Sequence, residues 1–226
     1  MTIQHNLITG NDLHEPKGVA EATSGKVYVA NGSGSGAWSL LNTANITAGA
    51  VTPTKLNGLA DNGTAGQLIQ TDGDGTFTYI DATSYGSAYF PFSTSTTYDF
   101  SATTTDAIVN PTLTAGTLKN FTLLSSPNLR LRYDGATDHA AFITVTFSSK
   151  QASGVDRDGE WAIFKNGTEI AGSRAVRTLG SGYGSITLIS DGTLSTNDYI
   201  EVKAKASGTC TMQFASFSIN VQGVLA

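Results

Sequence analysis

The chain has 226 residues, a net charge of −5 and 14% charged residues, well below the roughly 25% of an average soluble domain. Its 25 glycines, with abundant Thr, Ser, Ala and Asn, indicate an all-β protein with many turns rather than a helical enzyme. The negative charge and the scattered Lys and Arg residues argue against a nucleic-acid partner.

The first 23 residues have no secretory signal and no apolar run of the ~20 residues that span a bilayer. We therefore expect synthesis in a cytoplasm and no membrane insertion. The distinctive piece is "DLHEPKGV", in which Pro16 fixes its own φ and pushes Glu15 towards an extended conformation, while Gly18 allows a turn. A stiff segment with both charges suits docking onto another protein, through His14, Glu15, Pro16, Lys17 and Gly18. The alternative is an exposed turn.

Residues 24–85 contain a repeat. "GKVYVANGSGSGAWS" aligns without a gap with "GQLIQTDGDGTFTYI", so that Asn31-Gly32 falls on Asp72-Gly73 and Trp38 on Tyr79. Each copy predicts a small β-hairpin, over residues 24–39 and 65–80, joined by an extended segment. An isolated hairpin is marginal in water, so we expect contacts between chains. The residues predicted to make them are Val27, Val29, Trp38, Leu68 and Tyr79; the alternative is that each aromatic ring packs on its own hairpin.

The turns of these hairpins could also bind a ligand. Asp72 and Asp74 resemble half of a calcium loop, but the first copy has Asn31 and Ser33 at the same positions. A turn that accepts either pair is better explained by its backbone conformation than by metal binding.

Residues 86–226 form the part of the chain that can bury a core. Gly86 and Pro91 are expected to interrupt regular structure at the boundary. Beyond it apolar residues alternate with polar ones, most clearly in "LRLRY" (129–133) and "HAAFITVTFSS" (139–149). Asn166-Gly167 in "EWAIFKNGTEIAG" predicts a tight hairpin turn. Roughly eight to ten strands are expected, the number of a β-sandwich or jelly roll.

Residues with catalytic potential are few. Cys210 lies in a strand-like run and is expected to be a buried apolar residue. The acidic residues Asp156, Asp158 and Glu160 of "VDRDGEW" could form the carboxylate pair of a glycosidase, but they precede a strand at Trp161 in what reads as a solvated loop. His5 or His14 could form a metal ring on a threefold axis, although a hydrogen-bonding role is favoured. We expect no catalytic residue, no metal and no cofactor.

Three parts of the chain resemble known protein families. "HNLITGNDLHEPKGVAEATSGKVYVANGSGSGAWS" resembles N-terminal segments of bacteriophage virion fibre and capsid-decoration proteins, and "NITAGAVTPTKL" with "AGQLIQTDGDGTFTYI" looks like the shaft repeats of phage fibres. "FITVTFSS", "IFKNGTEIAGS" and "LSTNDYIEV" resemble the trimeric jelly roll of the tumour-necrosis-factor type. In the last segment Asn197 stands where that family usually has Gly, which puts the turn geometry there in question.

The resemblance implies an all-β homotrimer on the virion surface, with a virion-attachment arm (1–23), two hairpin repeats (24–85) and a C-terminal antiparallel jelly roll (86–226). Its implied role is non-enzymatic capsid decoration, as a cement or head-fibre protein bound to the major capsid protein or another virion protein. The alternative is a tail-fibre protein that recognises a host surface glycan or outer-membrane protein.

Overall fold

The computed structural model describes residues 23–30, 33, 36–41, 46, 51–52, 55–56, 58–59, 61, 63–125, 127–153 and 155–226. They form two compact units, residues 1–62 with 71–77 and residues 63–70 with 78–226. The protein is all-β, and no helix of the described residues is long and apolar enough to cross a membrane.

The strands, in chain order, are β1 (Val27–Ala30), β2 (Gly36–Ser39), β3 (Gln67–Thr71), β4 (Phe77–Asp81), β5 (Thr83–Phe90), β6 (Tyr98–Ala102), β7 (Ala107–Ile108), β8 (Thr114–Lys119), β9 (Phe121–Leu124), β10 (Arg130–Tyr133), β11 (His139–Ser153), β12 (Arg157–Lys165), β13 (Thr168–Glu169), β14 (Ala175–Leu179), β15 (Gly184–Leu194), β16 (Tyr199–Ala206) and β17 (Cys210–Leu225). β1 pairs with β2, and β3 with β4, each in a two-stranded sheet.

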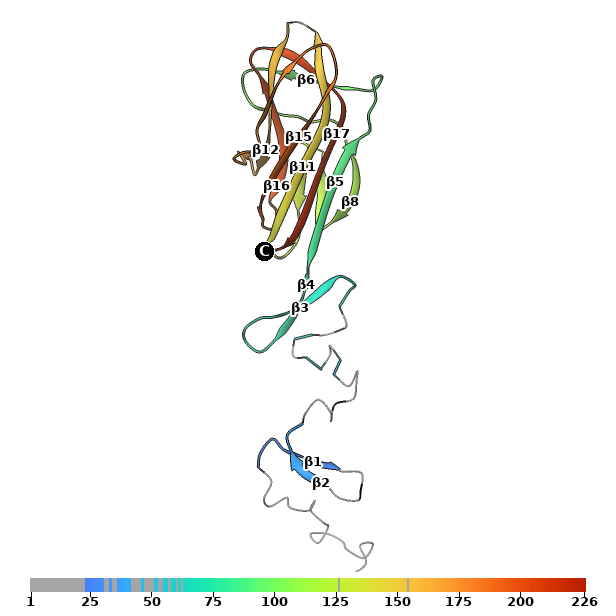
Figure 1. The fold of residues 1–226 in the computed structure, drawn as a ribbon, viewed down its shortest axis with the longest axis vertical. Coiled ribbons are helices and arrows are strands. Elements are labelled where there is room, and N and C mark those ends of the chain that lie inside the picture. Colours follow the sequence, from blue (N-terminus) through green and yellow to red (C-terminus); the bar gives the residue numbers. More distant parts are fainter. Residues whose placement is uncertain are drawn as a thin grey trace, which may run out of the picture. The chain divides into compact units, whose positions relative to one another are not determined.

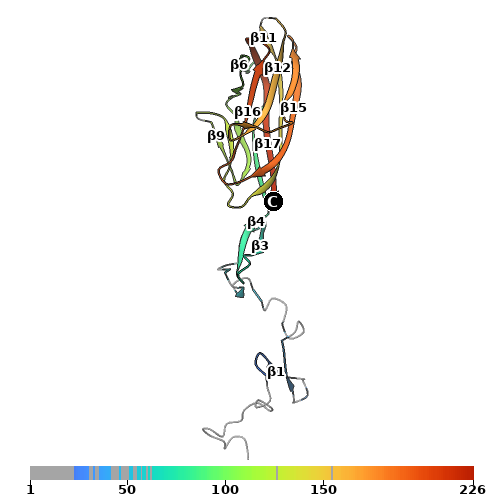
Figure 2. The same ribbon diagram turned by 90° about the vertical axis from the view of Figure 1, so that its left-hand side faces the viewer.

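The remaining strands form a jelly-roll sandwich of two antiparallel sheets (Figures 1 and 2). The first sheet has the order β15-β11-β17-β5-β8, with β6 also paired to β17. The second has the order β13-β12-β16-β10-β9, with β14 paired to β12 and β7 to β16. The first strand of the sandwich, β5, therefore lies beside the last, β17, so that both ends of the unit are held in one sheet.

The period-two alternation of the sequence sets the core. On β11 the residues at alternate positions point inwards and are at most 4% exposed: Ala141, Ile143, Val145 and Phe147. Leu131 and Tyr133 on β10 are 1% and 0% exposed, while Arg130 and Arg132 at the alternate positions face out. Cys210 is buried and free, as expected, and burial raises the pKa of its thiol. The face assignments made from the alternation are confirmed.

Two asparagines hold turns in the left-handed conformation that usually favours glycine. Asn166 and Gly167 have φ values of 52° and 82° and join β12 to β13, as the sequence predicts. Asn197 has a φ of 72°, and its backbone N–H donates to the carbonyl of Tyr133 over 2.8 Å. Asn197 therefore keeps the turn at the position where the resembling family has Gly.

The start of the sandwich differs from the expectation. Gly86 does not interrupt regular structure: it lies inside β5, which begins at Thr83. A Cβ there would stand 2.7 Å from the ring of Phe121 and 2.8 Å from Leu131, so glycine is required for close packing. β6 and β14 were not expected from the sequence, and together with β5 they raise the number of strands above the estimate.

Candidate subunit interface

The outward side chains of the first sheet form rows across β15, β11, β17 and β5. The cross-strand register fixes these rows, and we call the surface that they make the neutral face. Its members are Thr187, Thr146, Ser218 and Tyr89; Ile189, Thr144, Asn220 and Ser87; Asp191, Phe142, Gln222 and Tyr85; and Thr193, Ala140, Val224 and Thr83. Asp191 is the charged member of these rows.

Large apolar side chains on the neutral face are open to solvent. Phe142 is 50% exposed, Ile189 55% and Val224 56%, and the two tyrosines, Tyr85 and Tyr89, are 42% and 43% exposed. Apolar surface of this kind gains about 25 cal/mol per Å² when it is removed from water. The face is thus apolar and uncharged enough to favour contact with another protein surface.

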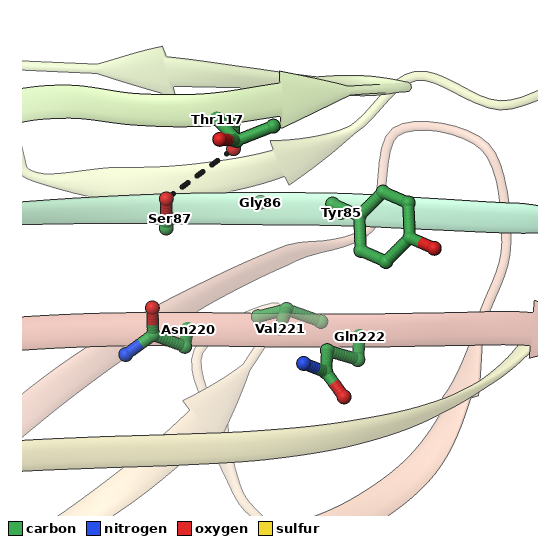
Figure 3. A pocket seen from close by; sticks show the side chains of 7 residues that line it. All are labelled: Tyr85, Gly86, Ser87, Thr117, Asn220, Val221 and Gln222. Carbon is green, nitrogen blue, oxygen red and sulfur yellow. Dashed lines mark hydrogen bonds between the residues drawn. The ribbon is translucent and has the colours of Figure 1, made fainter.

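Two shallow grooves run along this face. The first, of about 310 Å³, lies between β5 and β17 (Figure 3). In it Tyr85 lies beside Gln222 and Ser87 beside Asn220, and the hydroxyl of Ser87 donates to the carbonyl of Thr117 over 3.3 Å. The second groove, of about 460 Å³, is lined by residues of β11, β15 and β17, among them Phe142 and Val224. Both grooves offer neutral hydrogen-bonding groups beside apolar ones.

The outer face of the second sheet has the opposite character. Glu201 is 2% exposed, and its carboxylate accepts from Arg130 at 2.9 Å and lies 3.3 Å from the Lys203 ammonium. Glu160 pairs with Lys205 at 3.2 Å and with Arg174 at 3.2 Å. The outer face of the second sheet is therefore covered by ion pairs, whereas Asp191 is the charged member of the neutral face.

The residues predicted from the sequence to mediate contacts are distributed as follows. His14, Glu15, Pro16, Lys17 and Gly18 lie outside the described residues, as does His5. Their docking role stays a prediction.

The residues predicted to make hairpin contacts between chains lie on β1 to β4. Trp38 lies opposite Tyr28 across β1 and β2, with ring centroids 5.5 Å apart in an edge-to-face arrangement. Val27 is 37% exposed and Leu68 52%, whereas Val29 and Tyr79 are half-buried. Their role between chains stays a prediction, with apolar surface left exposed at two of the positions.

The Asp72–Thr76 turn uses its carboxylates internally. The Thr76 hydroxyl donates to Asp72 over 3.0 Å and to Asp74 over 2.6 Å, and the Thr76 backbone N–H donates to Asp74 over 2.9 Å. These bonds, the hydroxyl bond first, lower the pKa of Asp74. The described residues contain no group of three or more His, Cys, Asp or Glu side chains that could hold a metal ion. The turn is explained by its own hydrogen bonds.

The acidic run is placed differently from the expectation. β12 begins at Arg157, so Asp158 and Glu160 lie in a strand and not in a solvated loop. Asp158 accepts a hydrogen bond of 2.6 Å from Thr178, and Glu160 is held by its two cations. Their partners come from β14, β16 and the chain before β14, which no local reading of "VDRDGEW" could supply.

The neutral face was not predicted from the sequence. Its signal was present in β11, where the outward residues Phe142, Thr144 and Thr146 carry no charge. Tyr85, Asn220 and Gln222 join them only through the pairing of β5, β17 and β11, which are far apart in the chain.

No protein-family model and no curated protein matches the chain. Among solved structures, the Eiger TNF of S. frugiperda is similar at 13% identity, over 63% of this chain and 94% of that one, with a TM-score of 0.41. The PRD1 vertex protein P5 is similar at 10% identity, over 63% of this chain and 97% of that one, with a TM-score of 0.38. Murine APRIL is similar at 13% identity, over 58% of this chain and 98% of that one, with a TM-score of 0.32.

Proposed function

We propose that the chain is a non-enzymatic structural protein of a bacteriophage virion, a homotrimer that decorates the capsid as a cement or head-fibre protein. Residues 1–23 attach to the major capsid protein or to another virion protein, and the jelly roll, the knob of the fibre, faces outwards. The resemblance of the N-terminal segments to phage fibre and decoration proteins supports the virion assignment.

One observation carries the trimer: the neutral face is partly apolar and has Asp191 as its charged member, while the opposite face of the sandwich is covered by ion pairs. A second and a third copy of the chain are the occupants that we assign to it. Three neutral faces turned towards a threefold axis cover one another, and the charged faces then remain in water. The hairpin residues Val27, Val29, Trp38, Leu68 and Tyr79 add further contacts between the same chains.

Trimerisation also explains how attachment works without chemistry. Each trimer presents three copies of residues 1–23, so three weak contacts with neighbouring capsid subunits act together. Effective concentration, rather than the strength of any single contact, then holds the protein on the virion.

A second candidate is receptor recognition by a tail fibre. It is favoured by a groove of about 240 Å³ that is lined by the rings of Phe90 and Tyr98, by Pro111 and by Thr96, Thr97 and Thr112. Aromatic faces beside neutral hydroxyl groups suit an uncharged sugar. Binding of labelled host-envelope glycans, lost in a Phe90→Ala variant, would favour this candidate.

Copy number separates the two candidates. Quantitative mass spectrometry of purified virions should give hundreds of copies for a decoration protein and a few tens or fewer for a tail fibre. A low copy number would overturn the capsid assignment.

Sedimentation tests the proposed trimer, and a reducing-sugar assay tests for catalysis. The full chain should sediment as a trimer, and a monomer at micromolar concentration would contradict the proposal. Incubation with host surface polysaccharide should release no reducing sugar, with or without calcium.

A further inference from the structure

Asp191 is the charged residue in the rows of the neutral face. It lies on β15 and is exposed, and among the described residues no Lys, Arg or His nitrogen lies within 4.0 Å of its carboxylate. Covering a carboxylate without a cation beside it is strongly unfavourable. A trimer that covers the neutral face is therefore more stable when a cation of another copy reaches Asp191.

The row of Asp191 crosses the whole sheet. Asp191 pairs with Phe142, and Phe142 pairs with Gln222. Gln222 pairs with Tyr85, and Tyr85 pairs with Lys119 at the end of β8. Directly opposite residues point to the same face of a sheet, so Lys119 belongs to the neutral face as Asp191 does. Since β15 and β8 are the two edges of this sheet (Figure 1), a carboxylate and an ammonium stand at one level on opposite edges.

Each edge strand carries one charged residue. β15 has the sequence GSITLISDGTL and β8 the sequence TAGTLK. The six strands of the sheet contain one other cation, Lys150, which lies eight residues along β11 from Phe142, or about 27 Å at about 3.4 Å per residue. Within this sheet, Lys119 is therefore the cation whose level matches Asp191.

The Lys119 ammonium can serve a second carboxylate. Its Nζ atom lies 3.7 Å from Oδ1 of Asp81, which is longer than a hydrogen bond, and its side chain is 33% exposed. Oδ2 of Asp81 accepts from the Asn120 amide over 3.0 Å. Because an ammonium group has three N–H donors, Lys119 can remain near Asp81 and donate to a carboxylate of another copy.

A ring of three sheets brings these two edges together. When three neutral faces surround a common axis that runs along the strands, the β15 edge of each copy meets the β8 edge of the next. Rotation about that axis preserves height, so Asp191 and Lys119 meet at the same level. A twofold contact pairs an edge with itself and brings no opposite charge to either residue, so the charges favour the head-to-tail ring.

We propose that Asp191 of each copy forms an ion pair with Lys119 of the next copy, three times around the trimer. This inference rests on the trimer of the proposed function and names the side chains that close it. The pair compensates the charge of Asp191 where the neutral face is covered, and it determines which edges meet.

Charge reversal in the full chain tests the pair. Asp191→Lys and Lys119→Glu should each raise the concentration at which the trimer dissociates by at least about tenfold, equivalent to about 1.4 kcal/mol, in sedimentation velocity. The double variant Asp191→Lys/Lys119→Glu should return to within a few-fold of the wild type. Val176→Lys and Val176→Glu are the matched controls and should leave the trimer unchanged, because Val176 is 62% exposed on the outer face of the second sheet.

A neutral variant separates the contact between copies from the contact within one chain. Lys119→Glu also places a second carboxylate near Asp81 of its own chain, which can destabilise the fold. Lys119→Gln removes the charge without adding this repulsion, and it should still raise the dissociation concentration by about threefold or more. Asp191→Asn should have an effect of similar size, because it removes the other half of the same pair.

A mixing experiment tests whether the pair joins different chains. An equimolar mixture of the Asp191→Lys and Lys119→Glu proteins should form trimers at concentrations at which each protein alone is dissociated. In a mixed trimer two of the three junctions bring opposite charges together, whereas each homotrimer has like charges at all three.

The outcomes separate the inference from the proposed function. A wild-type monomer overturns both the ion pair and the proposed trimer. A stable wild-type trimer overturns the ion pair alone if the variants of Asp191 and Lys119 do not weaken it, or if the Val176 controls weaken it equally. The ion pair is also overturned if neither the double variant nor mixing restores the trimer.

Discussion

At the scale of single residues, Asp198 organises the turn before β16. Its carboxylate accepts from the Ser195 backbone N–H at 2.9 Å and from the Asn166 amide at 2.6 Å, and it lies 3.3 Å from the Lys165 ammonium. Burial acts to raise the pKa of Asp198, but the bonds from Ser195, Asn166 and Lys165 together lower it. A single carboxylate thus ties the β12–β13 turn to the β15–β16 turn.

The lowered pKa predicts an acid-labile contribution to stability. A carboxyl group with a depressed folded-state pKa stabilises the fold above its unfolded pKa of about 3.9, and this stabilisation is lost as the pH falls through the folded pKa. Asp198→Asn should therefore lower the free energy of unfolding by about 1–2 kcal/mol at pH 7. In urea unfolding between pH 7 and pH 2.5, the unfolding free energies of the wild type and Asp198→Asn should converge below pH 4. A difference in free energy that stays constant with pH would contradict the prediction.

Arg174 is the second organising residue. Its guanidinium lies 2.9 Å from Asp106, 3.2 Å from Glu160 and 2.5 Å from Glu169, so one side chain connects three segments. Arg174→Met should destabilise the protein by about 2 kcal/mol, because three carboxylates lose a common partner. Arg174→Lys keeps the charge without the planar guanidinium fork. Its Tm should therefore lie between those of the wild type and Arg174→Met. Equal stability of all three proteins would show that the network contributes nothing.

Single turns could be predicted from the sequence, whereas the side-chain networks around Asp198 and Arg174 could not. Asn166-Gly167 is a local signal, since the two residues adopt the positive φ values that their types favour. The partners of Glu160 and Asp198 come from distant strands, so the strand placement of Asp158 and Glu160 was missed. A pattern of neighbouring residues carries no information about which cation a fold brings to a carboxylate.

At the scale of strands, the neutral face is the element that we expect to carry assembly. Phe142 lies in the middle of it on β11, between Asp191 and Gln222, and half of its surface is exposed. Phe142→Asp should therefore raise the dissociation concentration of the trimer by more than tenfold, because it places a charge in a desolvated contact. Sedimentation velocity measures this change.

Val176→Asp provides the control for Phe142→Asp. Val176 is a comparably exposed apolar residue, but it stands on the outer face of the second sheet. The Val176→Asp substitution should leave the dissociation concentration of the trimer unchanged. A trimer that tolerates Phe142→Asp would exclude the neutral face as the contact surface.

The buried face of a strand could be predicted where apolar residues on one face alternate with polar residues on the other. β11 alternates buried and exposed residues over most of its length, so its inward set was assigned correctly from the sequence alone. β5 and β14 were missed, because Gly86 looked like an interruption and "AVRTL" is too short to show a period. The neutral face needs three strands from distant parts of the chain, and for that reason it became visible only in the fold.

At the scale of the whole molecule, assembly and folding are coupled if the neutral faces close a trimer. Unfolding then releases three chains from one particle, so a higher protein concentration favours the folded state. A hundredfold increase in concentration corresponds to about 2 kcal/mol per chain, which for a sandwich of this size raises the Tm by about 5 °C. Scanning calorimetry over that concentration range should show this shift for the wild type.

The Phe142→Asp protein gives the matching comparison. Its jelly-roll core is untouched, because Phe142 points away from Ile143 and Val145, so it should fold as a monomer with a Tm that does not depend on concentration. The wild type and the variant should then differ most at high concentration and least at low concentration. A wild-type Tm that stays constant across the range would mean that each sandwich is stable alone, and that the neutral face serves a partner other than a copy of this chain.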